Sequence, residues 1–262
     1  MDYNIFMEIN QAFAILSKAG GPHAARIITE KFGTMSRFAV WRAARALRRG
    51  VPVAKIVHEK WFYGIPFYTN KHTMDPRPDT ETLVESVLRD WGKTPNLRVL
   101  DLGTGTGCVA ISLIMNLPRA SAIGVDVSRS ALRVANKNAC NMSLCDDFKA
   151  VHGTFTHTNL GGEQFDIIVS NPPYIAHGDS RVNAGAQFDP DVALYADDNG
   201  LAAYEEIATR ALSWIKRSGR IYLEIGAGMS RSVKSIFTNA GWKFVRADKD
   251  LGGKIRVLVF SL

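Results

Sequence analysis

The pattern of hydrophobic and polar positions divides the chain into a short helical part and a longer part in which strands and helices alternate. Residues 1–52 follow a helical period, which Gly20-Gly21-Pro22 should interrupt. Residues 53–75 are rich in β-branched and aromatic side chains around Gly64-Ile65-Pro66, which predicts a β-hairpin linker. Residues 76–262 alternate apolar strands with helical segments. This alternation predicts an α/β fold with a mostly parallel sheet covered on both faces.

The long part is expected to contain seven strands and five helices. The strands span Arg98–Leu102, Ala122–Val127, Phe148–His152, Asp166–Ser170, Arg220–Ile225, Lys243–Ala247 and Lys254–Phe260. The helices span Glu81–Trp91 (with Asp79 or Thr80 as its cap), Gly107–Leu117, Arg129–Ala139, Leu201–Lys216 and Met229–Ala240. The linker between the last two strands is too short for a helical crossover, so this pair should be antiparallel.

A glycine-rich turn follows the first of these strands. Gly103, Gly105 and Gly107 occupy every second position between a buried strand and an apolar helix, where the backbone must turn sharply and approach a ligand. Asp101 stands just before the turn, where its charge would repel a pyrophosphate but suit an ammonium or sulfonium group. Asp126 ends the next strand, where a carboxylate can accept hydrogen bonds from ribose hydroxyls. The order of these features predicts a nucleoside-cofactor site, although Asp126 could instead cap a helix.

A second motif, Asn171-Pro172-Pro173-Tyr174, follows the strand that ends at Ser170. Proline has no N–H to donate, so a turn of this kind leaves carbonyl acceptors available. The Asn171 side chain adds another acceptor, and the Tyr174 ring adds a flat face. We interpret the four residues as a pocket for a planar group that carries an NH₂, rather than as a purely structural turn.

Both motifs together resemble those of class I S-adenosylmethionine-dependent methyltransferases that act on a planar amino or amide nitrogen. The segment Pro76-Arg77-Pro78-Asp79-Thr80-Glu81 lies between the helical part with its hairpin and the sheet, and is similar to the HemK/PrmC family. These enzymes methylate the side-chain amide of the glutamine in the Gly-Gly-Gln motif of peptide chain release factors. Further agreement lies at Phe188-Asp189-Pro190, Ala193-Leu194, Gly200-Leu201, Leu223-Glu224-Ile225-Gly226 and Asp250–Val257.

The resemblance implies a role for each motif and a domain organisation. The residues implied in binding S-adenosylmethionine are Gly103, Thr104, Gly105, Thr106, Gly107, Asp126 and Asn171, with Phe155 as a candidate for adenine. The residues implied in holding the glutamine amide are Asn171, Pro172, Pro173 and Tyr174. Residues 1–52 would form a substrate-docking domain and residues 76–262 the catalytic domain. A cytoplasmic monomer that acts on release factors, without a metal and without a nucleic-acid substrate, is expected.

Three positions depart from the usual pattern of that family. Asp75 precedes Pro-Arg-Pro, where an aliphatic or aromatic residue is usual. Gly153-Thr154-Phe155 follow the third strand, where an acid and an aromatic residue are usual near the adenine. Trp61 precedes Phe62, where glutamate is frequent.

Charge is concentrated in the N-terminal part. Residues 1–75 hold 11 Lys/Arg and 5 Asp/Glu, a net charge of +6, whereas residues 76–262 hold 21 and 20, a net charge of +1. A helix is expected from Met35 to Arg49, with Thr34 as its N-cap; one stripe carries Val40, Trp41, Ala44 and Leu47, and the opposite stripe carries Arg42, Arg45 and Arg49. This basic face could meet an acidic protein or an RNA-rich particle, or be an ordinary solvated surface.

Two other functions fit parts of the pattern. Adenine also presents a planar NH₂, so a DNA or RNA adenine N-methyltransferase is the main alternative. Against it, only 75 residues precede Pro76, whereas DNA methyltransferases usually need a sizeable recognition region and must flip the base. A non-enzymatic module that binds S-adenosylmethionine or RNA would leave the intact tetrad at 171–174 unexplained.

Composition excludes several broad classes. Hydrophobic residues make up 46% and charged residues 22% of the chain, which is typical of a globular protein. The apolar run Val109–Met115 is too short to span a bilayer, and a secretory signal is not expected at the N-terminus. The three cysteines, Cys108, Cys140 and Cys145, contain no Cys-x-x-Cys, so neither a disulfide framework nor a zinc site is expected.

Overall fold

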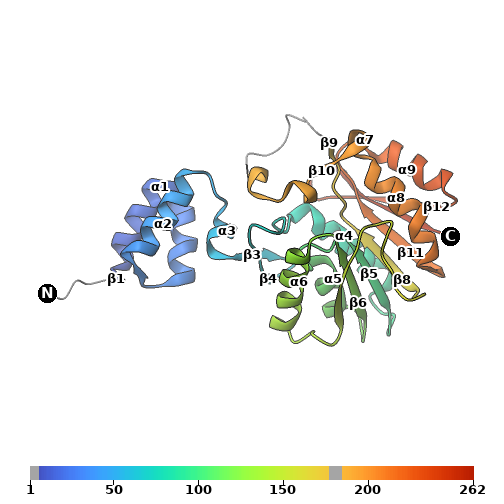
Figure 1. Ribbon diagram of the computed structural model, residues 1–262, viewed down its shortest axis with the longest axis horizontal. Coiled ribbons are helices and arrows are strands. Elements are labelled where there is room, and N and C mark those ends of the chain that lie inside the picture. The colour runs from blue at the N-terminus through green and yellow to red at the C-terminus, as the bar shows by residue number, and fades with distance from the viewer. Residues whose placement is uncertain (1–5, 177–184) are drawn as a thin grey trace.

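A computed structural model describes residues 6–176 and 185–262 of the chain. Figure 1 shows a small helical part that stands to one side of a larger part built around a twisted sheet. The helical part contains β1 (Phe6–Met7), α1 (Ile9–Phe32), β2 (Met35–Ser36), α2 (Arg37–Arg48) and α3 (Val53–Val57).

The helical part is held together by the apolar faces of its helices. Buried residues of α1, among them Leu16 and Ile28, pack against Val40 and Leu47 of α2. Gly20 lies where the two helices approach most closely, since a Cβ there would come within 2.8 Å of the Leu47 side chain. Gly21 has φ 87° and ψ 162°, so the predicted interruption of the helix appears as a kink within α1.

The structure corrects one detail of the prediction for α2 and adds another. The cap is Ser36, not Thr34, because Met35 and Ser36 pair with β1 and the helix begins only after them. Ser36 Oγ accepts a hydrogen bond from Ala39 N at 3.1 Å. Trp41 shares the predicted stripe with Val40, Ala44 and Leu47 but, unlike them, is 53% exposed, and it stacks with Phe38 at a centroid distance of 6.3 Å. Arg42, Arg45 and Arg49 are exposed, as expected.

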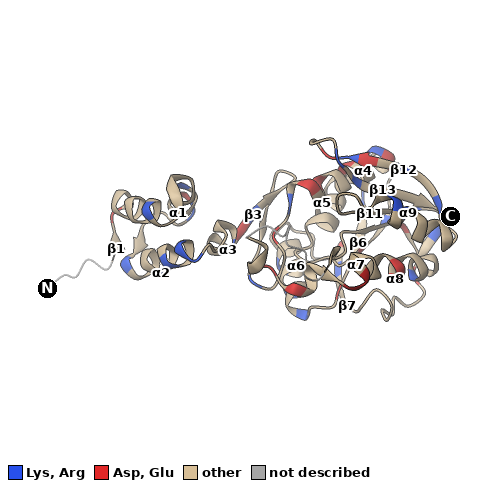
Figure 2. Ribbon diagram, turned by 90° about the horizontal axis from the view of Figure 1, so that it is seen from above, with Lys and Arg blue, Asp and Glu red and all other residues tan. Residues whose placement is uncertain are grey.

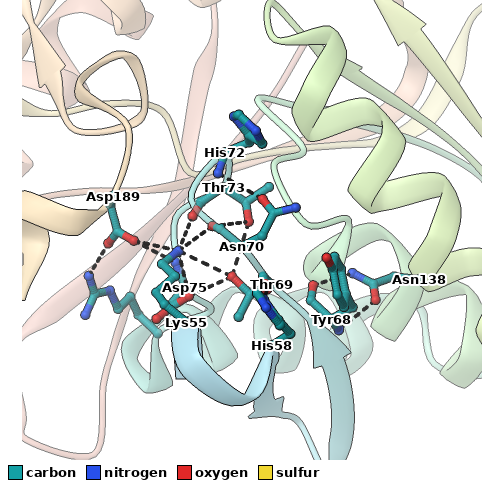
Figure 3. A network of polar contacts seen from close by, with 11 residues as sticks. Lys55, His58, Tyr68, Thr69, Asn70, His72, Thr73, Asp75, Asn138 and Asp189 are labelled. Carbon is teal, nitrogen blue, oxygen red and sulfur yellow. Dashed lines mark hydrogen bonds and ion pairs between the residues drawn. The ribbon is translucent and has the colours of Figure 1, made fainter. Parts of the chain in front are cut away.

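The predicted hairpin is present as β3 (Glu59–Phe62) and β4 (Ile65–Tyr68), but it does not begin at Val53. Residues 53–57 form α3, because Val53, Ile56 and Val57 have helical spacing and pack on the core of α1 and α2. Asn138 joins the hairpin to the glycine-rich turn: its amide bonds both backbone groups of Tyr68 and the Thr106 carbonyl, at 2.8–3.0 Å (Figure 3).

A seven-stranded sheet forms the centre of the larger part, in the order β12-β13-β11-β8-β5-β6-β7. The strands are β5 (Arg98–Leu102), β6 (Ser121–Asp126), β7 (Phe148–His152), β8 (Phe165–Ser170), β11 (Ile215–Glu224), β12 (Lys243–Lys249) and β13 (Ile255–Ser261). Strand β13 runs antiparallel to β11 and β12, and the other neighbours are parallel. The predicted α/β class and the antiparallel last pair are confirmed.

Helices cover both faces of this sheet. The helices are α4 (Glu81–Trp91), α5 (Cys108–Asn116), α6 (Arg129–Asn141), α8 (Ala202–Arg210) and α9 (Ser230–Asn239). Strand residues alternate between the two faces, so that Ile167 packs with α4 and α5 whereas Ile168 packs with α8 and α9. The active-site side of such a sheet lies at the carboxyl ends of its parallel strands.

One predicted helix, Leu201–Lys216, is wrong at its C-terminal end. The helix stops at Arg210, a 3₁₀ turn (η4, Ala211–Ser213) follows, and β11 already begins at Ile215. Ile215 pairs with Phe165 of β8, and the register then shifts before Arg220. Gly219 lies in this irregular stretch, where a Cβ would come within 2.8 Å of the Asp166 carbonyl oxygen.

The cysteines also differ from the expectation. Cys140 and Cys145 form a disulfide, because the turn after α6 brings their Cα atoms to 4.7 Å. Cys108 is free and buried. Within residues 6–176 and 185–262, no group of three or more His, Cys, Asp or Glu residues has the arrangement of a metal site. In that same part of the chain, no helix combines the length and apolar character needed to cross a membrane.

Candidate active site

The glycine-rich turn joins the carboxyl end of β5 to α5. Gly103, Gly105 and Gly107 all have positive φ, of 78°, 56° and 80°, which explains why glycine stands at each position. Gly107 also permits close packing behind the turn, since a Cβ there would lie 2.9 Å from Ile111 Cδ1. The three glycines therefore expose backbone instead of side chains at this edge of the sheet.

Two carboxylates support the turn. Asp126, at the end of β6, accepts hydrogen bonds from Gly105 N at 2.9 Å and Ser128 N at 2.8 Å. The helix cap is Ser128 rather than Asp126, because Ser128 Oγ accepts from Ala131 N at 3.2 Å. Asp101 is 2% exposed and accepts a hydrogen bond from Thr104 Oγ1 at 2.7 Å, and burial raises the pKa of its carboxyl to about 7.

A first cavity of about 350 Å³ lies over this turn, within the size range of small-molecule pockets. It is lined by Asp101, Gly103, Thr104, Gly105, Thr106, Asp126, Phe155, Asn171 and Pro173, and by residues from the segments 72–77 and 190–197. The Phe155 ring stands 3.7 Å from where a Gly103 Cβ would be. Of the residues proposed from sequence for a nucleoside cofactor, Gly107 alone is not part of this lining.

A second cavity lies beside the first and contains the whole tetrad Asn171-Pro172-Pro173-Tyr174. Its other lining residues include Arg77, Asp79, Glu224 and Arg256. The two spaces meet along five shared lining residues: Asn171 and Pro173 of the tetrad, together with Met74, Arg77 and Ala193. A ligand in one cavity can therefore face a group that enters from the other.

The Asn171 side chain is oriented from behind. Its Nδ2 donates to Thr80 Oγ1 at 3.2 Å, and hydrogen bonds from Asn171 and Thr80 lower the pKa of Glu224. Burial opposes this lowering and is the larger effect, so the Glu224 pKa rises to about 7. Among the described residues, Asn171 Oδ1 has no hydrogen-bond partner although it is buried. A buried acceptor without a hydrogen bond lowers the stability of the fold, so its presence here indicates that a ligand donates a hydrogen bond to it.

The Tyr174 ring forms the other side of the second cavity. A Cβ at Gly226 would lie 3.0 Å from Tyr174 Cδ2, so this glycine provides the space in which the ring lies. Burial raises the pKa of the Tyr174 hydroxyl to about 12, and the hydroxyl therefore stays protonated at neutral pH.

Comparisons with known proteins agree with this arrangement. Residues 76–200 match the family model "Methyltransferase small domain". The chain is 35% identical over 250 residues to a release factor glutamine methyltransferase of Caulobacter vibrioides, covering 94% of this chain and 86% of that protein. The chain belongs to the release factor glutamine methyltransferase family. The HemK/PrmC resemblance inferred from the motifs is thereby confirmed.

Other similar proteins are longer than this chain or share only its fold. The chain is 38% identical to a bifunctional methyltransferase of Rickettsia conorii, over 80% of this chain but 45% of that protein. It therefore spans less than half the length of such relatives. The crystal structure of a ribosomal protein L11 methylase from Lactobacillus delbrueckii subsp. bulgaricus superposes with a TM-score of 0.54 at 16% identity, covering 72% of this chain and 81% of the other. That likeness agrees with the class I methyltransferase fold.

The polar residues of the segment Pro76–Glu81 connect separate parts of the chain, because each of their side chains contacts a different segment. Arg77 pairs with Asp189 at 2.6 Å, and Asp79 pairs with Arg256 of β13 at 2.6 Å. Thr80, expected as a helix cap, makes no cap hydrogen bond and accepts from Asn171 instead. Glu81 Oε1 accepts from Tyr63 N of the hairpin turn at 2.9 Å.

Four side chains of the site were not among the residues predicted for it: Thr80, Glu224, Arg77 and Arg256. Each lies within a segment that resembles the family, but none is close in sequence to the tetrad. One feature of the sequence indicated that Glu224 has a role in the site: it follows Leu223 at the end of a buried strand. A carboxyl group is seldom buried there without a partner.

Proposed function

We propose that this chain transfers a methyl group from S-adenosylmethionine to the side-chain amide nitrogen of the glutamine in the Gly-Gly-Gln motif of peptide chain release factors. One observation carries the proposal. The two cavities meet at Asn171, whose buried Oδ1 has no partner in the described part of the chain. A primary amide that enters from the second cavity would offer the missing donor at the point where the first cavity ends.

The first cavity suits S-adenosylmethionine in its donor set. Each carboxylate oxygen of Asp126 accepts one backbone hydrogen bond, from Gly105 or Ser128. The remaining lone pairs can accept hydrogen bonds from ribose hydroxyls. Asp101, once ionised, would attract the cationic end of the cofactor, and Phe155 offers a ring for the adenine. The remaining binding residues would be Gly103, Thr104, Gly105, Thr106, Gly107 and Asn171. When bound, the cofactor supplies an electrophilic methyl group.

The residues of the tetrad would act by positioning. An amide nitrogen is a weak nucleophile, because its lone pair is delocalised into the carbonyl. Asn171 Oδ1 and the Pro172 carbonyl would accept hydrogen bonds from the amide NH₂ and aim the nitrogen at the first cavity. As the nitrogen gains positive character, these acceptors bind it more strongly, and this difference lowers the barrier. The methylated nitrogen would then release one of its two protons to water. The Tyr174 ring and Pro173 would hold the amide plane.

Glu224 and Thr80 would hold Asn171 in the orientation that this chemistry needs. An asparagine amide can turn either its oxygen or its NH₂ toward a ligand. Here Nδ2 is engaged by Thr80 and Glu224, so Oδ1 faces the site. Glu224 in its carboxylate form can only accept hydrogen bonds, so it excludes the opposite orientation.

The docking surface for the release factor would be the exposed side of α2, in a domain of residues 1–52. Arg42 lies over the Phe38 ring at 5.8 Å and Arg45 over the Trp41 ring at 5.6 Å, and Phe38 is 65% exposed. Arginines give this helix several blue segments in Figure 2. Exposed aromatic and arginine side chains are enriched at protein interfaces, and the positive charge suits an acidic protein partner. The enzyme would act as a monomer in the cytoplasm.

The experiment that tests the proposal offers labelled S-adenosylmethionine together with, in turn, a release factor, duplex DNA and ribosomal RNA. We expect label on the release factor alone, and none on a release factor whose Gly-Gly-Gln glutamine is replaced by alanine. Label on either nucleic acid would favour an adenine methyltransferase and contradict the proposal.

A further inference from the structure

The described residues contain a buried charged cluster that the methyl transfer itself does not use. Lys55 Nζ lies 2.8 Å from Asp75 Oδ1 and 3.0 Å from Asp189 Oδ1, and Arg77 pairs with the second oxygen of Asp189 (Figure 3). The side chains of Lys55, Asp75 and Asp189 are 6%, 8% and 2% exposed. Three of the four charges in this cluster are thus buried, and Arg77, whose side chain is 37% exposed, balances the second carboxylate from its edge.

The cluster joins three separate pieces of chain. Lys55 belongs to α3, whose apolar side packs into the core of α1 and α2. Its ammonium also bonds the backbone carbonyls of Asn70, at 2.9 Å, and of Thr73. Asp189 precedes the residues of segment 190–197 that line the first cavity. Lys55 therefore holds together two walls of that cavity, segments 72–77 and 190–197.

Asp75 is the reason why this lysine is needed. The Asp75 backbone N–H donates to Asp189 Oδ1 at 3.3 Å, so the two acids lie side by side. Thr69 donates to Asp75 Oδ1 at 2.6 Å but brings no charge. Without Lys55, only Arg77 would remain to compensate two buried carboxylates, and the uncompensated charge would push the walls apart or draw water between them.

We propose that Lys55 and Asp75 form a charge-compensated clasp over the first cavity, with Lys55 as a positioning residue for S-adenosylmethionine binding. The proposal rests on the proposed function, because it takes the first cavity as the cofactor site. It assigns a role to Asp75, which departs from the usual family pattern. It also makes the walls of the cofactor cavity depend on α3, an element packed on the helical part.

Calorimetric titration of S-adenosylmethionine into four proteins tests the clasp. Lys55→Met should weaken binding by about tenfold or more, because it leaves a buried acid unpaired. The double variant Lys55→Met with Asp75→Asn removes one charge of each sign and keeps the Arg77–Asp189 pair. Because asparagine keeps the size of the Asp75 side chain, which lines the cavity, the double variant should recover most of the affinity lost in Lys55→Met. Lys31→Met is the matched control, since it removes an exposed ion pair between α1 and β3, with Glu59, and should leave the Kd unchanged.

Each outcome bears on the clasp. Unchanged binding in Lys55→Met, or a double variant as weak as the single one, would overturn it. A purely structural lysine would lower the melting temperature of Lys55→Met without changing the Kd of the folded protein. If Lys55→Met does not fold, a double variant that folds and binds supports the clasp, and one that fails to fold contradicts it. Absence of binding in the wild type would contradict the proposed function instead.

Discussion

The two cavities that meet at Asn171 are built in different ways. The first takes its floor from one short stretch, the turn after β5, and from the end of the neighbouring strand β6. The second is assembled from segments far apart in the chain, including 77–79, 171–176, 224–229 and 254–256. The floor of the first offers glycine backbone and the carboxylates of Asp101 and Asp126, whereas the second offers oriented side chains. The floor of the methyl-donor cavity is thus a local property of the sequence, whereas its walls, from segments 72–77 and 190–197, and the orientation of the acceptor depend on the whole fold.

The largest effect should come from Asn171, which is one of the residues that line both cavities. Asn171→Ala removes an acceptor that should bind best in the transition state. By comparison with loss of one oxyanion-hole donor, the single-turnover rate should fall by about 10²–10³. Titration of S-adenosylmethionine should show a smaller loss, because the glycine-rich turn and Asp126 remain. A rate within tenfold of wild type would remove Asn171 from the chemistry.

Two substitutions of Tyr174 distinguish the role of its ring from the role of its hydroxyl in the second cavity. Tyr174→Phe keeps the face that fills the space above Gly226, so we expect a loss of less than about tenfold, or 1.4 kcal/mol. Tyr174→Ala opens the cavity to water and should be far slower. Single-turnover rates on a release factor compare the two. A phenylalanine variant as inactive as the alanine variant would assign the hydroxyl a chemical role and contradict this account of the pocket.

Glu224 gives the second cavity a pH dependence. Its pKa is about 7 because burial outweighs the hydrogen bonds from Thr80 and Asn171; Asp79 raises it further and Arg256 lowers it. The carboxylate form is the one that holds Asn171, so kcat should rise with pH through about 7. Glu224→Gln should lower kcat by about tenfold at pH 8 and flatten the profile.

The control for Glu224 is measured at saturating cofactor, because Asp101 also has a pKa of about 7 and would affect cofactor binding. S-adenosylmethionine affinity should be nearly the same in wild type and Glu224→Gln. A rise through pH 7 that persists in the glutamine variant belongs to another group and contradicts the orienting role.

Asp126 tests the first cavity on its own. Asp126→Ala should weaken S-adenosylmethionine binding by about 1.5–3 kcal/mol, the range for hydrogen bonds to a charged group. Ser36→Ala is a matched control outside the cavity: it removes the cap of α2 and should lower stability by about 1 kcal/mol without changing the Kd. Equal affinities of the Asp126 variant and wild type would restrict Asp126 to holding Gly105.

The smallest effect at saturating substrate should come from the helical part. Reversal of Arg42, Arg45 and Arg49 to glutamate should slow association with an intact release factor, most strongly at low salt, and leave cofactor binding unchanged. Stopped-flow methylation at two ionic strengths measures this. Equal rates for the variant and wild type at low salt would show that this face does not dock the substrate.

The same contrast explains what the sequence could predict. Strand β5, helix α4 and the glycine-rich turn were predictable because their patterns are local and strong. The start of β11 at Ile215 was missed, since it depends on pairing with Phe165 rather than on its own periodicity. Helical spacing put Trp41 on one stripe with Val40, Ala44 and Leu47, but spacing does not say which apolar positions become buried.

Within the site, the tetrad was predictable but its support was not. Asn171 could be proposed as an acceptor from its neighbours in sequence. That Thr80 and Glu224 engage its NH₂ depends on contacts across 91 residues and on the carboxyl end of β11, and no local pattern encodes them. The Lys55 cluster is similar, because Asp189 meets its partners only in the folded chain.

The position of the transferred methyl group tests the account most directly. A release factor is incubated with the enzyme and isotopically labelled S-adenosylmethionine, and the peptide containing Gly-Gly-Gln is fragmented in a mass spectrometer. The account predicts a single methyl group on the side-chain nitrogen of that glutamine, and a yield about 10²–10³ lower in the same time with Asn171→Ala. A methyl group on any other residue, or equal yields from the two enzymes, would contradict it.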